Sequence, residues 1–92
     1  MKPFFLPLMK KYYLQFAEGT KKTEYRMEKG MYNKNQLFVG RNILISNGYS
    51  KKDRLNGVIT RVYRSKRAAR RSDFIAIYGV QEYAFCFDIE LS

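Results

Sequence analysis

The densest group of side chains that could do chemistry lies in residues 18–26, which read EGTKKTEYR and contain Lys21, Lys22, Glu24 and Arg26. An arginine can hold a phosphate or a base edge through two parallel hydrogen bonds, whereas a lysine acts as a point charge. A glutamate beside them can hold a basic side chain in place or accept hydrogen bonds from the exocyclic amine of a base. The group therefore indicates a nucleic-acid-binding rim. The plainer alternative is a solvated edge strand whose charges discourage pairing with other strands.

The same residues could support catalysis. Lys21, if desolvated beside cationic neighbours, could have a lowered pKa and act as a base, and Glu24 could handle the proton of a leaving amine. Thr23 could supply a hydroxyl, but the alternation of a strand places it on the opposite face from Glu24. Histidine is absent, which excludes Ser/His/Asp and Cys/His arrangements and any zinc site built on histidine. We expect no metal and no cofactor, and among enzymes we favour a ribonuclease, because proton transfer on RNA needs no protein nucleophile.

A second set of basic residues is expected to follow the backbone of a nucleic acid outside this rim. Its members are Arg41, Lys51, Lys52, Arg54, Arg64, Lys66, Arg67, Arg70 and Arg71. Tyr49 and Tyr63 lie beside these charges and could stack on unpaired bases, although half-burial in a strand is the more common role of such tyrosines. The run RSKRAARR at 64–71 could begin a helix capped by Ser65 or form a basic loop.

The charge of the whole chain favours a polyanionic partner. The 18 basic and 8 acidic residues give a formal net charge of +10. Residues 1–71 hold all 18 basic residues and four acidic ones, a net charge of 18 − 4 = +14, whereas residues 72–92 hold four acidic residues and no basic one. We expect RNA or another nucleic acid as the partner, with an acidic protein as the alternative, and we expect residues 72–92 to be buried framework. Simple solubility is the plainest explanation of the charge.

Length and composition predict one domain over residues 1–92, since a chain this short can bury only one modest core. The single cysteine, Cys86, cannot form an internal disulfide, which favours a reducing compartment such as the cytoplasm. No stretch approaches the ~20 apolar residues of a membrane span, and Pro3 and Pro7 interrupt the N-terminal apolar run, unlike in a signal peptide. We therefore expect no membrane association. The sequence leaves the oligomeric state open.

The spacing of apolar residues predicts the elements that position these side chains. Residues 4–9 are expected to be extended, because proline disfavours helix in its neighbourhood. Residues 9–18 have apolar residues at helical spacing, and Gly19 supplies the left-handed residue that commonly ends a helix. From residue 22 to residue 28 the period becomes two, which predicts a half-buried strand. Its buried face is expected to hold Thr23, Tyr25 and Met27, and its solvent face Lys22, Glu24, Arg26 and Glu28.

The rest of the chain predicts a loop at 29–36, a core strand around 43–45 and a long strand at 55–64. Gly57 in the long strand marks a bulge or a close approach of two backbones. A short helix is expected at 73–78, with Asp73 near its positive N-terminus. The strongest strand pattern, nine alternating residues, covers 83–91, and Cys86 is expected to pack within it.

The order of these elements resembles the ASCH domain, a member of the PUA-like fold group. The matching residues are Gly19, Lys21, Glu24 and Arg26 in G-x-K-x-x-E-x-R and the later Val39–Gly40 pair, and the resemblance covers residues 8–91. It implies an α+β fold: a small mixed β-barrel with two or three short helices and a cleft where the first helix meets neighbouring strands. Members are regarded as RNA-binding modules, and some subgroups are hydrolases acting on RNA or on modified nucleosides.

Two positions depart from the pattern of the family. Arg41 follows the Val39–Gly40 pair, where the family often has an acidic residue. Glu24 stands where the acetylcytidine amidohydrolase subgroup has a threonine, which removes that nucleophile. We therefore expect binding of RNA, with a hydrolase as the alternative. If Lys21 and Glu24 form an exposed rim, replacing either by alanine should leave the melting temperature nearly unchanged.

Overall fold

The long strand β4 (Arg54–Ser65) organises the sheet. In the computed structural model, which describes residues 1–92, its first half pairs with β3 (Asn42–Asn47) and its second half with β5 (Ala84–Leu91), both antiparallel. The edge strands are β1 (Phe4–Leu8), parallel to β3, and β2 (Thr23–Arg26), antiparallel to β5. The five strands form one mixed sheet in the order β1-β3-β4-β5-β2.

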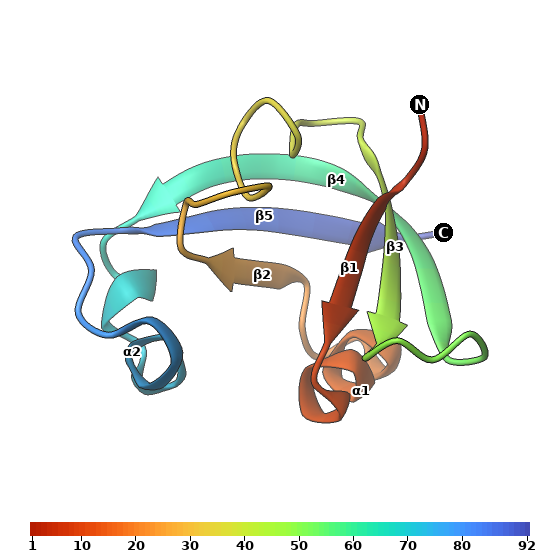
Figure 1. Ribbon diagram of the computed structural model, residues 1–92, viewed down its shortest axis with the longest axis horizontal. Coiled ribbons are helices and arrows are strands. Elements are labelled where there is room, and N and C mark those ends of the chain that lie inside the picture. The colour runs from red at the N-terminus through yellow and green to blue at the C-terminus, as the bar shows by residue number, and fades with distance from the viewer.

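This sheet is curled into a half-barrel, in which β1 and β3 run across the direction of β5 and β2 (Figure 1). At Gly57, where β4 passes from one partner to the other, an added Cβ would lie 2.6 Å from Cγ2 of Ile89, so only glycine allows the close approach expected there. The register of β4 and β5 shifts between Ile59 and Arg61, and such a bulge bends a strand. The edge strands β1 and β2 do not pair, so the barrel is open between them.

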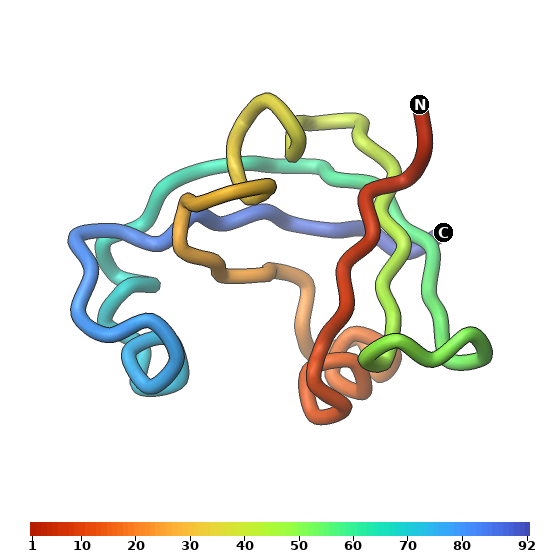
Figure 2. Tube along the Cα trace, viewed as in Figure 1, coloured from red at the N-terminus to blue at the C-terminus, as the bar shows by residue number.

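The helices lie along one side of this sheet (Figures 1 and 2). Helix α1 (Lys10–Glu18) follows β1 directly and ends at Gly19, whose φ of 82° is the left-handed conformation expected from the sequence. A short 3-10 turn, η1 (Ala68–Arg70), precedes helix α2 (Ser72–Tyr78). Ser65 accepts a hydrogen bond from the amide of Ala68, but the run 64–71 contains the end of β4 and the three-residue turn η1 and not a helix capped by Ser65. The predicted α+β class with short helices is confirmed, and the barrel is present as a half-barrel.

Two hydrophobic clusters hold these elements together. The larger lies on the concave side of the sheet and consists of Phe4, Leu6, Leu8, Tyr13, Phe16, Leu37, Ile43, Ile45, Ile59, Phe85, Phe87 and Ile89. The smaller lies under η1 and α2 and consists of Ala68, Ala69, Phe74, Ala84 and Cys86. Residues 84–87 are therefore buried on both faces, which confirms the packing role of Cys86. Helix α2, by contrast, exposes Ile75 and Ile77, so the prediction that all of residues 72–92 are buried framework is wrong.

The prediction of which face of β2 is buried is also wrong. Glu24 is 6% exposed, whereas Thr23 and Tyr25 are only half-buried. Glu24 pairs with Phe87 across the strands, and residues opposite each other share one face of a sheet, so Glu24 faces the concave side. Strand alternation correctly separated Glu24 from Thr23, but it did not indicate which side the rest of the chain covers.

Two further features complete the fold. Residues 29–36 form turns, as expected, and end at Leu37, which is fully buried in the larger cluster although its loop context gave no sign of it. None of the helices has the length and apolar character needed to cross a membrane.

Candidate functional site

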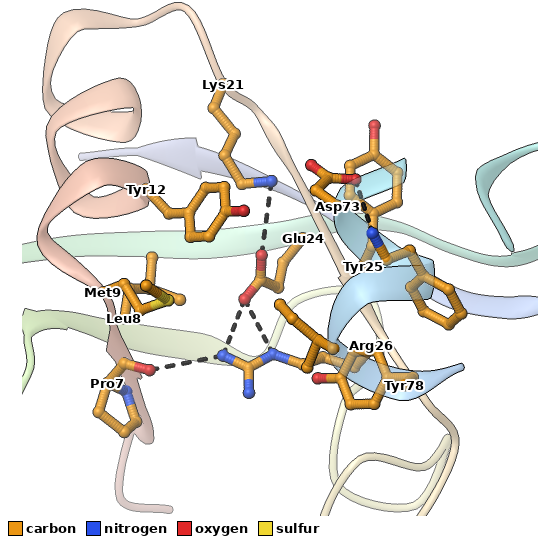
Figure 3. A pocket seen from close by; sticks show the side chains of 12 residues that line it. Pro7, Leu8, Met9, Tyr12, Lys21, Glu24, Tyr25, Arg26, Asp73 and Tyr78 are labelled. Carbon is orange, nitrogen blue, oxygen red and sulfur yellow. Dashed lines mark hydrogen bonds and ion pairs between the residues drawn. The ribbon is translucent and has the colours of Figure 1, made fainter. Parts of the chain in front are cut away.

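A pocket of about 220 Å³ lies between α1 and α2, at the opening between the two edge strands (Figure 3). Strand β2 forms one wall with Lys21, Glu24, Tyr25 and Arg26 on and just before it. The end of β1 and the first turns of α1 form the second wall with Pro7, Leu8, Met9 and Tyr12, and α2 forms the third with Asp73, Phe74, Ile77 and Tyr78. The pocket therefore joins parts of the chain that are far apart in sequence.

The centre of the pocket is an ion network around Glu24. Its Oε2 accepts hydrogen bonds from Nε of Arg26 at 2.9 Å and lies 2.8 Å from Nη2 of the same arginine. Its Oε1 lies 3.5 Å from Nζ of Lys21. The three side chains are 7%, 19% and 10% exposed for Glu24, Arg26 and Lys21, so little water screens the charges. One carboxylate thus holds Lys21 and Arg26, two of the three basic residues of GTKKTEYR, in fixed positions.

Arg26 also bridges the open edge of the half-barrel. Its Nη2 donates to the carbonyl oxygen of Pro7 at 3.4 Å, which connects β2 to β1 where no strand pairing exists. The guanidinium lies 4.6 Å from the ring centroid of Tyr32. Burial alone would lower the pKa of Arg26, but the Glu24 carboxylate, together with Tyr32 and Tyr78, outweighs this effect and raises the pKa above its usual value, so Arg26 stays charged.

Lys21 lies among aromatic rings. Its Nζ is 4.7 Å from the ring centroid of Tyr25, 5.4 Å from that of Tyr12 and 5.6 Å from that of Phe16. Burial lowers the pKa of Lys21, and the Glu24 carboxylate opposes this shift only in part. Lys21 is therefore a cation with a reduced preference for its proton, held against ring faces that attract positive charge.

The end of α1 sets the position of Lys21. After Gly19 reverses the backbone, the amides of Thr20 and Lys21 both donate to the carbonyl oxygen of Gln15, at 3.0 and 3.1 Å. This turn returns the chain toward the helix, so that the lysine side chain meets Tyr12 as well as Glu24. The spacing of glycine and lysine in the motif thus has a direct geometric reason.

Helix α2 contributes pocket residues that the sequence did not reveal. Asp73 lines the pocket, and both of its oxygens accept hydrogen bonds from Arg71 at 3.1 Å. The pKa of Asp73 is lowered, chiefly by these hydrogen bonds. Arg71 also lies 4.7 Å from the ring centroid of Tyr25. The sequence predicted Asp73 only as a charge at a helix terminus, and it predicted Tyr12 and Tyr78 only as apolar residues of two helices. That these three residues line one pocket depends on how the two helices pack.

Most of the other residues expected to contact nucleic acid fall into two groups at opposite ends of β4. Tyr49, Lys51, Lys52 and Arg54 lie in or beside the loop before β4, next to α1, and Lys66, Arg67, Arg70 and Arg71 follow β4 next to α2 (Figures 1 and 2). The structure therefore does not bring these residues into one surface. Lys66, Arg67 and Arg70 are exposed on the α2 side, and Lys22 is exposed beside β2 but does not line the pocket.

Two of the arginines expected to contact nucleic acid make interactions within the protein. Arg41 donates to the carbonyl oxygens of Gln36 at 2.8 Å and Lys2 at 3.0 Å, at the start of β1 and therefore at the far end of that strand from the pocket. Arg64 donates through Nε and Nη2 to Glu28, at 2.7 and 2.9 Å. Tyr63 is half-buried against the smaller cluster, with the guanidinium of Arg61 4.2 Å from its ring centroid.

The pocket holds the charged groups of Lys21, Glu24, Arg26 and Asp73 and the phenols of three tyrosines. Thr23 points to the other face of β2, where its hydroxyl donates to Oδ1 of Asp88, so this aliphatic hydroxyl is not available as a nucleophile beside Lys21. The structure groups no three acidic or cysteine side chains in a way that could hold a metal ion. The arrangement is suited to binding, and Lys21, whose pKa is lowered by burial, is a candidate base.

A scan against protein-family models finds no match to this chain, and a search of curated proteins finds no significant match. The function is therefore inferred from the pocket and the charges around it.

Proposed function

We propose that this chain is a small nucleic-acid-binding domain of the ASCH type, with RNA as its first ligand, and that its pocket takes one unpaired nucleobase. The observation that carries the proposal is the meeting of Lys21, Glu24 and Arg26 in a pocket whose walls include three tyrosines, Tyr12, Tyr25 and Tyr78. The curled mixed sheet with helices along one side is compatible with the PUA-like resemblance. The one cysteine, Cys86, is free and buried, which is compatible with a cytoplasmic protein.

The charges inside the pocket favour a base over a phosphate. Lys21 and Arg26 contribute two positive charges, and Glu24 and Asp73 contribute two negative ones, so the formal sum is 2 − 2 = 0. A phosphate would have to approach the Glu24 carboxylate, which is only 7% exposed and therefore poorly screened, and this is costly. A neutral base meets no such repulsion.

The hydrogen-bonding groups and the walls suit a flat, polar ring. Arg26 uses Nε and Nη2 for Glu24 and Pro7, which leaves Nη1 as a donor (Figure 3). Lys21 has three N–H donors, and Glu24 occupies one direction. These donors match the carbonyl oxygens of a base, and the tyrosine rings can pack against its faces. The volume of about 220 Å³ is below the ~300–1,000 Å³ of pockets for larger ligands, so a single base is the appropriate size.

The positive field outside the pocket supplies the attraction to the phosphates. The chain carries a net charge of +10, whereas the pocket is neutral, so the excess lies on the surrounding surface. Arg67 and Arg70 are exposed on the side of α2, and the loop with Lys51 and Lys52 is exposed on the side of α1. A single strand that places a base between the two helices can approach both groups.

The test is fluorescence anisotropy with a labelled single-stranded RNA of about 8 nucleotides at about 50 mM salt. We expect a dissociation constant in the micromolar range or below. Lys21→Met and Lys22→Met form a matched pair, because each removes one positive charge but only Lys21 lines the pocket. Lys21→Met should weaken binding by about tenfold, equivalent to about 1.4 kcal/mol, and Lys22→Met by clearly less.

Two outcomes would overturn the proposal. Absence of binding at low salt would end the assignment to nucleic acid, and equal losses for Lys21→Met and Lys22→Met would show that general charge, and not the pocket, holds the RNA. An acidic protein partner is distinguished by treating a pull-down with nuclease, because a protein partner would survive the treatment.

A hydrolase acting on RNA or on a modified nucleoside is the second candidate, and the environment of Lys21 favours it. Burial lowers the pKa of this lysine, which brings it closer to the range useful for a base, and Glu24 lies 3.5 Å away. Thr23 does not accompany the pair as a nucleophile, since its hydroxyl donates to Asp88. We expect no product release from acetylated cytidine, measured by chromatography. Product whose formation Lys21→Met abolishes would make catalysis the function.

A further inference from the structure

Two aromatic rings lie side by side on the surface next to the pocket. Tyr49, in the turn after β3, is 81% exposed, and Phe5 of β1 is 37% exposed. Their ring centroids are 6.0 Å apart, with an angle of 35° between the planes. Phe5 points away from the core, because Phe4, Leu6 and Leu8 are the buried residues of β1. An aromatic pair this exposed contributes little to the fold and leaves ring area free for a ligand.

The surroundings of this pair are basic. The guanidinium of Arg54 lies 5.6 Å from the ring centroid of Phe5, and Nε of Arg54 donates to the carbonyl oxygen of Ser50 at 3.0 Å, which holds it there. Lys51 and Lys52 are exposed in the same loop. The one acid of the loop, Asp53, lies 3.4 Å from the side-chain amide of Asn47. Positive charge beside exposed rings is the arrangement that single-stranded nucleic acids use.

The pair is continuous with the wall of the pocket. The amide of Gly48, the residue before Tyr49, donates to the carbonyl oxygen of Leu8 at 2.8 Å, and Leu8 lines the pocket. Pro7, which also lines the pocket, lies on the same face of β1 as Phe5, two residues and roughly 6.5 Å along the strand. A ligand that leaves the pocket over the edge of β1 therefore reaches Phe5 and Tyr49 next.

We propose that Phe5, Tyr49 and Arg54 form a stacking platform for a second unpaired base of the same single-stranded nucleic acid, with Lys51 and Lys52 binding its phosphates. This site rests on the proposed function of the pocket and extends it, because it requires a ligand longer than one nucleotide. A flat base can cover the exposed ring of Tyr49, whereas the carboxylates of an acidic protein cannot stack on it. With the platform, the domain binds short single-stranded nucleic acids through two bases.

The first experiment compares oligonucleotide and mononucleoside binding in Tyr49→Ala and Tyr49→Phe. Loss of one stacked base weakens binding by roughly 5- to 150-fold, so Tyr49→Ala should lower the affinity for a single-stranded RNA of about 8 nucleotides by such a factor. Tyr49→Phe should restore it, because the ring remains. Binding of the corresponding nucleoside, followed by NMR, should stay unchanged in both variants, since the nucleoside reaches only the pocket.

The second experiment uses the absence of tryptophan from the chain. Tyr49→Trp introduces a single tryptophan on the platform, which can be excited selectively over the tyrosines, and its emission should be quenched when the RNA binds and stacks on it. Met31→Trp is the matched control, because Met31 is 58% exposed in the segment between β2 and β3 and is not part of the platform. Its emission should not change. A charge control pairs Lys51→Gln/Lys52→Gln with Lys29→Gln/Lys34→Gln, and only the first pair should strongly weaken RNA binding.

The outcomes separate the platform from the pocket. RNA that binds wild type and Tyr49→Ala equally, or leaves the emission of Tyr49→Trp unchanged, would overturn the platform while the pocket stands. Failure of every RNA and nucleoside to bind wild type would overturn both. A platform that binds an acidic peptide, and loses it in Tyr49→Ala, but binds no RNA would assign the surface to a protein partner and refute the stacking proposal.

Discussion

Two glutamates that lie four positions apart, Glu24 and Glu28, each bind one arginine through both Nε and Nη2. The distances are nearly the same, 2.9 and 2.8 Å for Glu24 with Arg26 and 2.7 and 2.9 Å for Glu28 with Arg64. The surroundings differ: the side chains of Glu24 and Arg26 are 7% and 19% exposed, whereas those of Glu28 and Arg64 are 20% and 53% exposed. Distances alone therefore do not rank the two pairs.

The difference in burial determines what each pair does. Water can replace either partner of the Glu28–Arg64 pair, so this pair fastens the chain after β2 to β4 with little net stabilisation. Water replaces Glu24 poorly, because Arg26 and Lys21 would remain charged in a dry pocket. The buried network is thus required to keep a charged pocket folded, and the exposed pair is an accessory contact.

The largest expected effect is the loss of stability in Glu24→Gln. The substitution keeps the shape of the side chain but leaves Arg26 and Lys21 without their carboxylate. Removing one partner of a buried pair costs about 3–5 kcal/mol, and the partial exposure of Arg26 places this case near about 3 kcal/mol. Urea denaturation followed by circular dichroism measures it.

Glu28→Gln is the matched control, with the same chemical change in an exposed pair, and its unfolding midpoint should hardly move. Equal losses of unfolding free energy in the two variants would contradict this comparison, since burial would then not determine how much each pair stabilises the fold. The sequence alone predicted that Glu24→Ala would leave the melting temperature nearly unchanged, because it placed Glu24 on a solvated rim. The burial of Glu24 reverses that prediction.

Local patterns explain how much of this architecture could be read from the sequence. Apolar spacing and Gly19 predicted the extent of α1, and alternation predicted β4 and β5, because these signals act within one element. The grouping of Lys21, Glu24 and Arg26 was also predictable, since all three follow one helix end and share one short strand segment. Alternation identified the two faces of β2 but not the covered one, which depends on the curl of the whole sheet.

The missing parts of the site depend on long-range packing. Asp73 and Tyr78 reach the pocket only because η1 and α2 fold back beside β2, and no signal near them indicates this. The separation of the basic residues could have been predicted from the sequence. Strand β4 has 12 residues, so its two ends, Arg54 and Ser65, had to lie far apart. Attention to strand length would have divided that predicted surface into two.

Lys21→Met is expected to change stability much less than Glu24→Gln, because it removes a charge that opposes folding. Because burial lowers the pKa of Lys21, its charge opposes folding, and methionine keeps the apolar contact with Tyr12 and Tyr25 while Arg26 still holds Glu24. Stability at neutral pH should therefore stay within about 1 kcal/mol of wild type. In wild type, the unfolded chain binds more protons than the folded one between the lowered pKa and 10.5, so wild-type stability should gain on the variant as the pH rises through that window.

The stability difference between wild type and Lys21→Met, measured by urea denaturation at neutral pH and just below pH 10.5, isolates this lysine from the ionising tyrosines. Lys22→Met supplies the control, since it removes the same charge from an exposed site. A Lys21→Met variant as unstable as Glu24→Gln would show that the network acts as one unit, and that the two residues cannot be assigned separate roles.

The smallest effect concerns the exposed pair and should be visible only in acid. Hydrogen bonds from Arg64 lower the pKa of Glu28 below its usual 4.5, so the folded protein holds this carboxylate unprotonated more strongly than the unfolded chain does. The resulting stabilisation is present above pH 4.5 and is lost as the pH falls through the lowered pKa. Glu28→Gln and Arg64→Gln should each give a shallower decline of the melting temperature in that range, and added salt should reduce the difference from wild type. If the melting temperatures of both variants decline with pH in parallel with that of wild type, the Glu28–Arg64 pair contributes nothing to stability in solution. The comparison would then be between a stabilising pair at Glu24 and a pair at Glu28 without any effect on stability.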